Sequence, residues 1–176
     1  MDTVIFVNGT NHMDWIENWD DDAIYAVTQN SLTASMVGTS RFVSATKHTN
    51  YRKNIVYIGS MAYNHVLNAS APYCAAKAGL AHFARCMAWE LAPKNYDVFT
   101  VHPSNTAGAP MSEATIRGIM RYRGVDRDAA EQYWGAVLPK DRWLDKHDIG
   151  ETVADLISGT REYMSGGQIE LAGGQR

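Results

Sequence analysis

Short apolar runs rich in β-branched residues alternate along this chain with longer stretches of helical character. Four apolar runs predict strands, at 3–7, 54–58, 98–102 and 168–172. Three longer stretches predict helices, at 21–48, 72–91 and 148–158, and the segment 111–138 predicts two short helices. Strands that alternate with helices are typical of a parallel sheet, and continuous apolar runs fit strands buried on both faces. The expected fold class is therefore α/β, a parallel sheet of about four strands flanked by helices, in a single domain 1–176.

Local signals set the expected ends of the helices. Asp20, Asp21 and Asp22 open the helix at 21–48, because carboxylates face the positive end of a helix dipole. Pro93 stops the helix at 72–91. Asp148 is expected in the cap position of the helix at 148–158. Small residues in the first long helix form a stripe that permits close approach of another element: Ser31, Ala34, Ser35 and Gly38.

Composition excludes several classes of function. The chain of 176 residues is 45% hydrophobic and 20% charged, which argues against disorder. A net charge of −3 gives no reason to expect nucleic acid or an anionic membrane as partner. No apolar run approaches a membrane span, and the start of the chain does not read as a signal peptide. With two cysteines, Cys74 and Cys86, no disulfide framework is expected, and a cytoplasmic location is the default.

The strongest candidates for chemistry are Ser60, Tyr73 and Lys77. Tyr73 and Lys77 stand four residues apart on a predicted helix, so they share one face. A phenol has a pKa of about 10, and a nearby ammonium lowers it. Ser60 follows a predicted strand, 13 residues before Tyr73, at the sheet edge where ligands of open α/β sheets bind. Each signal alone is more often a surface helix pair or a turn residue, and their spacing favours catalysis.

Further motifs surround these three residues. The helix after Ser60 ends in an Ala-x-Glu-Leu-Ala pattern at 88–92. Asn30 stands in NWDDDAIYAVTQNSL, Asn8 and Gly9 stand in VNGT, and the last predicted strand reads GGQIELAGG. Together with the Ser and Tyr-x-x-x-Lys spacing, these motifs resemble those of the short-chain dehydrogenase/reductase family. The resemblance covers essentially all of the chain and implies a truncated Rossmann-like fold and an oxidoreductase of that type.

The resemblance implies a role for each site residue. Tyr73 would be the proton donor or acceptor, and Lys77 would lower its pKa and hold the nicotinamide ribose. Ser60 would orient the substrate oxygen, and Asn30 would hold a water that links Lys77 to solvent. The implied cofactor is NAD or NADP. The implied cofactor-binding set is Asn8, Gly9, Tyr73, Lys77, Pro103 and Thr106.

The sequence departs from the family pattern in the part that binds the dinucleotide. No Gly-x-x-x-Gly-x-Gly motif is present, so the adenosine half of the cofactor site is expected to be missing from these residues and the remaining site to be weak or incomplete. The family has Pro-Gly where this chain has Pro103-Ser104. The position of its nicotinamide-contacting threonine is Gly108, and Thr106 is the nearest threonine.

The strand at 3–7 would be central in the parent sheet and is expected at an edge here. An uncharged edge strand is normally covered, by another subunit or by a partner chain. The family's dimers pack the helices 21–48 and 72–91 against their symmetry mates, so a homo-oligomer is implied. The small-residue stripe fits that packing or packing on the sheet equally well.

Two further features affect the site. The segment 111–138 stands where the family has its substrate lid, although a packed helical pair is the alternative. The six histidines have no metal-ligand spacing, so no metal is expected, and Cys74 fits a small buried residue better than a nucleophile.

Three functions remain open. The first is an NAD(P)-dependent oxidoreductase acting on a small carbonyl or alcohol substrate, which the Ser, Tyr, Lys and Asn residues favour. The second is a lyase, isomerase or dehalogenase-type enzyme without a nicotinamide cofactor, which the missing glycine motif favours. The third is a non-catalytic assembly module, which the exposed edge strand favours.

Overall fold

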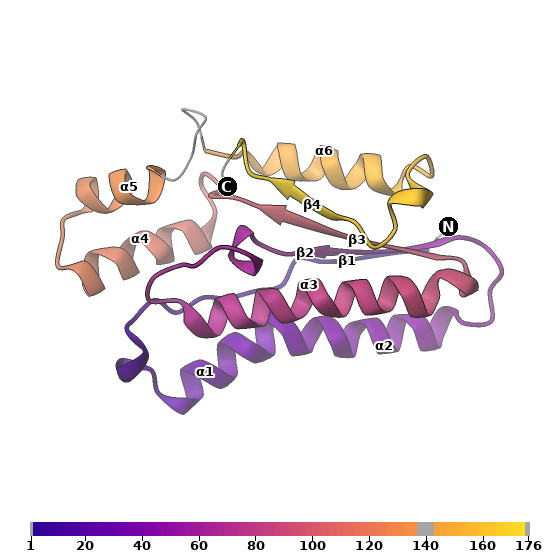
Figure 1. The fold of residues 1–176 in the computed structure, drawn as a ribbon, viewed down its shortest axis with the longest axis horizontal. Coiled ribbons are helices and arrows are strands. Elements are labelled where there is room, and N and C mark those ends of the chain that lie inside the picture. The colour runs from indigo at the N-terminus through magenta and orange to yellow at the C-terminus, as the bar shows by residue number, and fades with distance from the viewer. Residues whose placement is uncertain (1, 137–142, 175–176) are drawn as a thin grey trace.

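The computed structural model describes residues 2–136 and 143–174, in which a four-stranded parallel sheet carries helices on both faces (Figure 1). The strands lie side by side in chain order: β1 (Asp2–Phe6), β2 (Lys53–Ile58), β3 (Tyr96–Pro103) and β4 (Gln168–Leu171). They overlap the four runs expected from the sequence, and β1 is an edge strand. The α/β fold class with a Rossmann-like parallel sheet is therefore confirmed.

The helices form two layers and one projection (Figure 1). On one face lie α1 (Asp21–Thr28), α2 (Ala34–Thr46) and α3 (Ala71–Leu91), and α6 (Lys146–Ile157) covers the other. The pair α4 (Pro110–Arg123) and α5 (Arg127–Gly135) extends beyond the carboxyl ends of the strands. These two helices are the short helices expected within 111–138, of which 137 and 138 lie outside the described residues. None of the described helices has the length and hydropathy that crossing a bilayer requires.

Two apolar cores hold the layers together. Side chains of a strand alternate between the faces of its sheet. Ile55 accordingly packs with the α3 residues Leu80 and Leu91, while Val56 packs with the α6 residues Val153 and Leu156. Because β2 and β3 are covered on both faces, their apolar runs are nearly continuous.

The helix expected at 21–48 is one continuous helical segment with an irregular centre. Asp20 caps it, since its carboxylate accepts a hydrogen bond of 2.7 Å from the Ala23 amide. Between α1 and α2, residues Gln29–Thr33 form a π-helical turn. Such turns are rare and are frequent at functional sites. The last helical residue is Thr46, two residues before the expected end.

Ser31, Ser35 and Gly38 of the small-residue stripe face the sheet and the loop after β1, whereas Ala34 is exposed. A Cβ atom on Gly38 would lie 2.4 Å from the Phe6 ring, so only glycine lets α2 approach β1 this closely. Ser31 Oγ donates to the Thr10 carbonyl at 3.0 Å, and Ser35 Oγ donates to Asn8 Oδ1 at 3.1 Å. These contacts favour packing on the sheet as the purpose of the stripe.

The expectation that Asp148 caps the last helix was wrong by one helical turn. The cap is Asp145, whose carboxylate accepts a hydrogen bond of 2.8 Å from the His147 amide. Asp148 is the third residue of α6, and its carboxylate accepts from the Asp145 amide at 3.0 Å. The two aspartates thus form a reciprocal capping box, in which either one alone resembles a cap in the sequence.

Candidate active site

A cavity of about 390 Å³ opens at the carboxyl ends of the strands, between the loops after β1, β2 and β3 and the helices α3 and α4. This is the edge at which parallel α/β sheets bind ligands. Its wall contains seven of the eight site residues expected from the sequence: Asn8, Gly9, Ser60, Tyr73, Lys77, Pro103 and Thr106. Asn30 is not among the lining residues.

Lys77 is buried on α3, with 2% of its surface exposed. Its ammonium donates to the Ile58 carbonyl at 3.1 Å and to the Asn8 carbonyl at 3.5 Å, which places Nζ between the ends of β1 and β2. Burial lowers the pKa of Lys77 to about 8. A Cβ atom on Gly9 would lie 3.2 Å from Nζ, so the glycine leaves the ammonium accessible from the loop after β1.

Tyr73 lies one turn before Lys77 on the same helix face, and Lys77 Nζ is 5.8 Å from the centre of its ring. The ring is buried with Trp19, Val27 and Ala62. Its hydroxyl donates to Met111 Sδ at 3.9 Å. Burial raises the pKa of Tyr73 to about 12, and a hydrogen bond with Ser60 acts in the opposite direction. The phenol therefore keeps its proton at neutral pH.

Ser60 follows β2 by two residues and caps the short 3-10 turn Met61–Tyr63, where its Oγ accepts from the Ala62 amide at 3.2 Å. Its backbone rests against His102, a fully buried residue of β3. The Ser60 amide lies 3.3 Å from His102 Nδ1, and the Ser60 carbonyl lies 3.0 Å from the same nitrogen. The end of β3, which leads into the expected site residues Pro103 and Thr106, thus supports the backbone of Ser60 after β2.

The neighbours of His102 indicate its tautomer. Gln168 directs its amide nitrogen at the carbonyls of Gly166 and Gly167, so its oxygen faces His102 Nε2 at 2.8 Å. The proton of a neutral ring then sits on Nε2, and Nδ1 accepts from the Ser60 amide. Burial lowers the pKa of His102, while the Gln168 oxygen and the Ser60 carbonyl, which both accept from a protonated ring, act in the opposite direction.

Tyr63 and Gly59 complete this support. The Tyr63 ring stacks on His102 with centroids 3.8 Å apart, and its hydroxyl donates to Glu170 Oε1 at 2.6 Å. A Cβ atom on Gly59 would lie 2.5 Å from His102 Nδ1, so only glycine fits between β2 and the imidazole. Sequence reasoning missed His102. The available signal was a histidine inside an otherwise apolar strand, directly before Pro103.

Asn30 reaches the site through its backbone. It lies in the π-helical turn, and its side-chain amide donates to the Ala26 carbonyl at 2.8 Å within its own helix. Its carbonyl accepts from the side chain of Asn8, whose own carbonyl accepts from Lys77. A chain of hydrogen-bonding groups therefore runs from Lys77 through Asn8 to Asn30.

The residues expected to hold the nicotinamide lie together. Asn8, Gly9, Pro103 and Thr106 share the cavity wall with Lys77. Thr106 directs its hydroxyl at the Ser104 carbonyl, 3.1 Å away. Among the described residues, the buried Lys77 ammonium donates to backbone carbonyls and faces a cavity that Gly9 leaves open. In this respect the site fits a ribose, whose hydroxyl oxygen accepts from an ammonium. No glycine-rich phosphate motif accompanies it.

Several wall residues were not expected from the sequence. They come from the loop after β1, from the loop before α3 and from α4 and α5, and include Asn11, Met13, Leu67, Asn68, Ile119 and Trp134. Tyr63 and His65, in the loop after Ser60, are not among the wall residues. The helices α4 and α5 thus contribute to the cavity from the position expected for a lid.

Other candidate chemistry is not supported. Across residues 2–136 and 143–174, no group of three or more His, Cys, Asp or Glu side chains could hold a metal ion. Cys74 is half-buried and unpaired, and burial raises the pKa of its thiol, which disfavours a nucleophile.

Comparison with known proteins decides the family. A family model described as enoyl-(acyl carrier protein) reductase matches residues 2–176. The chain belongs to the short-chain dehydrogenase/reductase family. A related protein is the trans-4-hydroxycyclohexanecarboxylate dehydrogenase of Sinomonas cyclohexanicum, which is 25% identical over 171 residues. That alignment covers 97% of this chain and 57% of the relative, so this short-chain dehydrogenase/reductase chain spans less than two thirds of its relative's length.

Solved structures of family members share the fold. Sorbitol-6-phosphate 2-dehydrogenase from Erwinia amylovora superposes with a TM-score of 0.92 at 20% identity, over 99% of this chain and 68% of that one. An actinorhodin polyketide ketoreductase with NADPH also gives a TM-score of 0.92, at 22% identity, over 99% of this chain and 67% of that one. At this level of identity the likeness concerns the fold.

Proposed function

We propose that this protein interconverts a carbonyl compound and its alcohol with NAD or NADP. The observation that carries the proposal is that Ser60, Tyr73 and Lys77 share one cavity wall at the carboxyl edge of the sheet. Membership of a family of dehydrogenases and reductases supports it. Solved relatives that contain NADH or NADPH support a nicotinamide cofactor.

Ser60, Tyr73 and Lys77 each have a separate role in carbonyl reduction. A reduced nicotinamide, when bound, supplies the hydride to the carbonyl carbon. Ser60 Oγ donates a hydrogen bond to the carbonyl oxygen and holds it beside Tyr73. The phenol then gives its proton to that oxygen, and its raised pKa keeps it protonated until the oxygen gains negative charge. The nearby Lys77 ammonium stabilises the resulting phenolate.

Lys77 has a second role, in binding the cofactor ribose. An ammonium has three N–H donors, and the carbonyls of Ile58 and Asn8 accept from two of them. The third is available for a ribose hydroxyl. After the proton transfer, a water held at the Asn30 carbonyl links Lys77 to solvent: Lys77 returns a proton to Tyr73 and recovers one from that water.

The adenosine half of the dinucleotide needs groups beyond those of this sequence. The proposal includes a further segment, from a longer chain or a partner chain, that pairs with β1. Two features support it: β1 lies at the sheet edge, and its residue Ile5 is 41% exposed. A homo-oligomer through α2 and α3 is supported by the exposed side chains Met36, Val37 and Trp89. Two free cysteines support a cytoplasmic location.

Calorimetric titration with NADH and with NADPH tests the proposal first. We expect one of them to bind with a dissociation constant in the micromolar to millimolar range, and Lys77→Ala to weaken that binding. Tyr73→Phe is the matched variant, since it leaves the ammonium in place and should bind nearly as well. Reduction of a ketone panel under the same conditions then tests catalysis. Turnover of any substrate without either cofactor would contradict the proposal.

A further inference from the structure

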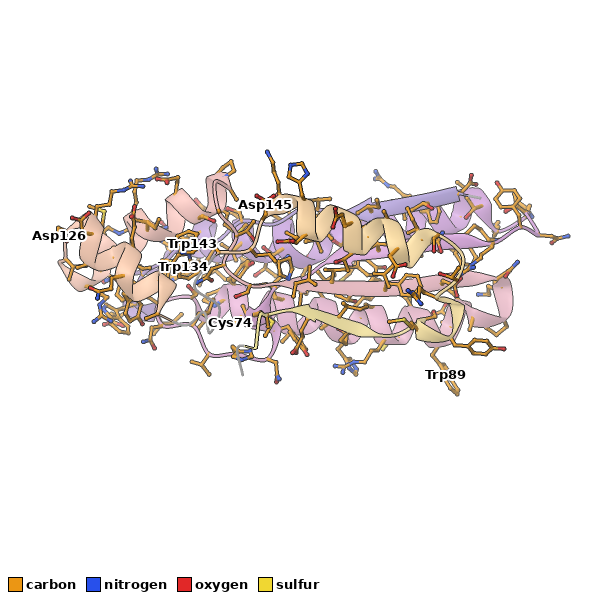
Figure 2. The ribbon with its side chains drawn as sticks, turned by 90° about the horizontal axis from the view of Figure 1, so that it is seen from above. Cys74, Trp89, Asp126, Trp134, Trp143 and Asp145 are labelled. Carbon is orange, nitrogen blue, oxygen red and sulfur yellow. The ribbon has the colours of Figure 1, made fainter. Side chains whose placement is uncertain are left out.

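The cavity lies at the end of the molecule towards which α4 and α5 project. Figure 2 shows Cys74, next to Tyr73 on α3, towards that end, whereas Trp89 of the same helix points outward at the opposite end. His102 of β3 is fully buried at this end and is not among the residues of the cavity wall. A polar group is costly to bury unless it is hydrogen-bonded, so the role of His102 depends on what its two ring nitrogens bind.

Nδ1 of His102 faces both backbone polar groups of Ser60. It lies 3.3 Å from the Ser60 amide nitrogen and 3.0 Å from the Ser60 carbonyl oxygen. Without a proton, Nδ1 accepts a hydrogen bond from the amide; with a proton, it donates to the carbonyl instead. The tautomer of the imidazole therefore decides which backbone group of Ser60 is held.

The strand β4 fixes the tautomer and the plane of the ring. Gln168 Oε1 lies 2.8 Å from His102 Nε2 and keeps the proton of the neutral ring on that nitrogen. Glu170 accepts from the hydroxyl of Tyr63, whose ring stacks on the imidazole with centroids 3.8 Å apart. Like His102, these three residues are not among those of the cavity wall. The Ser60 amide thus has an acceptor whose position does not depend on a bound substrate.

The position of Ser60 Oγ depends on the backbone that His102 holds. Ser60 has an extended backbone, and its Oγ accepts from the Ala62 amide at 3.2 Å. With its amide held by His102 and its Oγ held by Ala62, the serine has its own hydroxyl proton left to donate. In the proposed reaction that proton goes to the substrate oxygen beside Tyr73, and a misplacement of about 1 Å in such a group can cost as much as 10²-fold in rate.

We infer that His102 is a positioning residue for catalysis: by accepting from the Ser60 amide, it places Ser60 Oγ for its hydrogen bond to the substrate oxygen. This inference rests on the proposed carbonyl reduction and adds to it a residue that contacts neither substrate nor cofactor. Lys77 has a separate support, since its ammonium donates to the carbonyls of Ile58 and Asn8. Replacing His102 should therefore affect the serine rather than cofactor binding.

Two replacements of His102 separate the roles of its nitrogens. Asparagine places an acceptor where Nδ1 stands, whereas glutamine places a polar group where Nε2 stands and leaves the Ser60 amide without an acceptor. For the ketone that the wild type reduces fastest, His102→Gln should lower kcat by about 10-fold and leave the affinity for the reduced cofactor unchanged in calorimetric titration. His102→Asn should keep kcat within about threefold of the wild type. Equal losses of kcat in both variants would overturn the inference.

A double-mutant cycle shows whether His102 acts through Ser60. Ser60→Ala removes Oγ but keeps the amide that binds the imidazole, and it should lower kcat by about 10²-fold. In that background, His102→Gln should add a loss of less than about twofold, because the group that it misplaces is already gone. A further tenfold loss would show that His102 acts on another part of the site, against the inference.

Val101→Ala is the control for a weakened β3. Val101 is buried beside His102 in the chain, and its side chain packs in the core between the sheet and α6. The substitution should lower the midpoint of thermal unfolding but keep kcat within about twofold. A tenfold loss of kcat in Val101→Ala would assign the effect of His102→Gln to general loosening of the strand and would overturn the inference.

Amide hydrogen exchange gives a readout that does not need turnover. In protein labelled with ¹⁵N-serine, the amide signal that disappears in Ser60→Ala belongs to Ser60. This amide should exchange about 10-fold faster in His102→Gln, since its acceptor is gone, and at nearly the wild-type rate in His102→Asn. No turnover of any ketone counts against the proposed function, and the exchange rates still decide whether His102 holds Ser60.

His102→Asn alone is enough for a decision where His102→Gln does not fold. A folded His102→Asn protein that keeps both kcat and the slow exchange of the Ser60 amide supports the inference. Fast exchange of that amide in His102→Asn, or slow exchange in a folded His102→Gln protein, would overturn it.

Discussion

Two lysines of residues 2–136 and 143–174 are buried, with their ammonium groups near opposite ends of β2, and their surroundings differ. Lys53, at the amino end, is 1% exposed; its ammonium donates to the Thr49 carbonyl at 2.8 Å and lies 4.4 Å from the centre of the Tyr96 ring. Lys77, beside the carboxyl end, is 2% exposed but faces a cavity with one donor to spare. The first ammonium is enclosed by its own fold, whereas the second is held for an additional partner.

The largest expected effect is on catalysis. Lys77→Met should lower kcat/KM for ketone reduction by about 10²–10⁴-fold, since both general acid catalysis and cofactor binding use the ammonium. Tyr73→Phe should lower kcat by a similar factor while cofactor affinity stays nearly unchanged. Lys53→Met is the matched control and should retain activity within a few-fold. Steady-state kinetics checks all three, and a comparable loss in Lys53→Met would remove the contrast between the two lysines.

The next largest effect is on stability, which the same substitution, Lys77→Met, should raise. The lowered pKa of Lys77, about 8, means that folding disfavours its charge. Lys77→Met should therefore raise the free energy of unfolding at pH 7 by about 2 kcal/mol. Chemical denaturation measures this difference. A destabilised Lys77→Met variant would show that the ammonium is as well enclosed as that of Lys53.

The difference in the free energy of unfolding between Lys77→Met and the wild type depends on pH, because proton binding at Lys77 is linked to folding. Between pH 8 and 10.5 the unfolded state binds more protons at Lys77 than the folded state, so the stability of the wild type rises with pH. The advantage of Lys77→Met should be complete below pH 8 and vanish towards pH 10.5. Tyr73, whose pKa is raised to about 12, lowers the stability of both proteins above pH 10, so the comparison is made below that pH. Denaturation curves at a series of pH values decide this.

A smaller effect is expected at Gly59, which links the end of β2 to Ser60. Gly59→Ala would force a methyl group into His102 and shift Ser60 as well as the Ile58 carbonyl that binds Lys77, at a cost of about 1–2 kcal/mol. Activity should fall with it. The matched variant is Gly150→Ala on α6, where a Cβ atom meets nothing within 4 Å. It should stabilise by about 0.5–1 kcal/mol. Thermal unfolding and kinetics of both variants check this.

The smallest effect is expected at the enclosed lysine itself. Lys53→Met keeps the volume but loses a hydrogen bond to Thr49 and the contact with the Tyr96 ring. The free energy of unfolding should fall by about 1 kcal/mol. Chemical denaturation alongside Lys77→Met gives the comparison directly, because the two variants remove the same charge and should shift stability in opposite directions.

The sequence predicted what depends on local pattern and spacing. The alternation of apolar runs gave the strands, and a spacing of four on a helix put Tyr73 and Lys77 on one face. It could not predict the π-helical turn at Gln29–Thr33, because the hydrogen bonds of that turn leave no residue-type signature. Asn30 was expected to hold a water beside Lys77, and the sequence could not show that the group it turns toward Asn8 is its backbone carbonyl.

Contacts between distant segments were also beyond the sequence. His102 supports Ser60 across two strands, 42 positions apart, and nothing in either segment alone indicates the other. The partners of Lys77 are backbone carbonyls, which every residue has. Residue type alone therefore identified the ammonium and the phenol but not the groups that set their pKa values.

The order of the strands in the sheet repeats their order in the chain. During synthesis each new strand meets a partner that has already left the ribosome, so the sheet can grow by one strand at a time. By the time α3 emerges, the loops after β1 and β2 have supplied the backbone carbonyls that receive its lysine. The end of the cavity that holds Lys77 can thus form on the nascent chain before α4 and α5, which complete the wall, have been made.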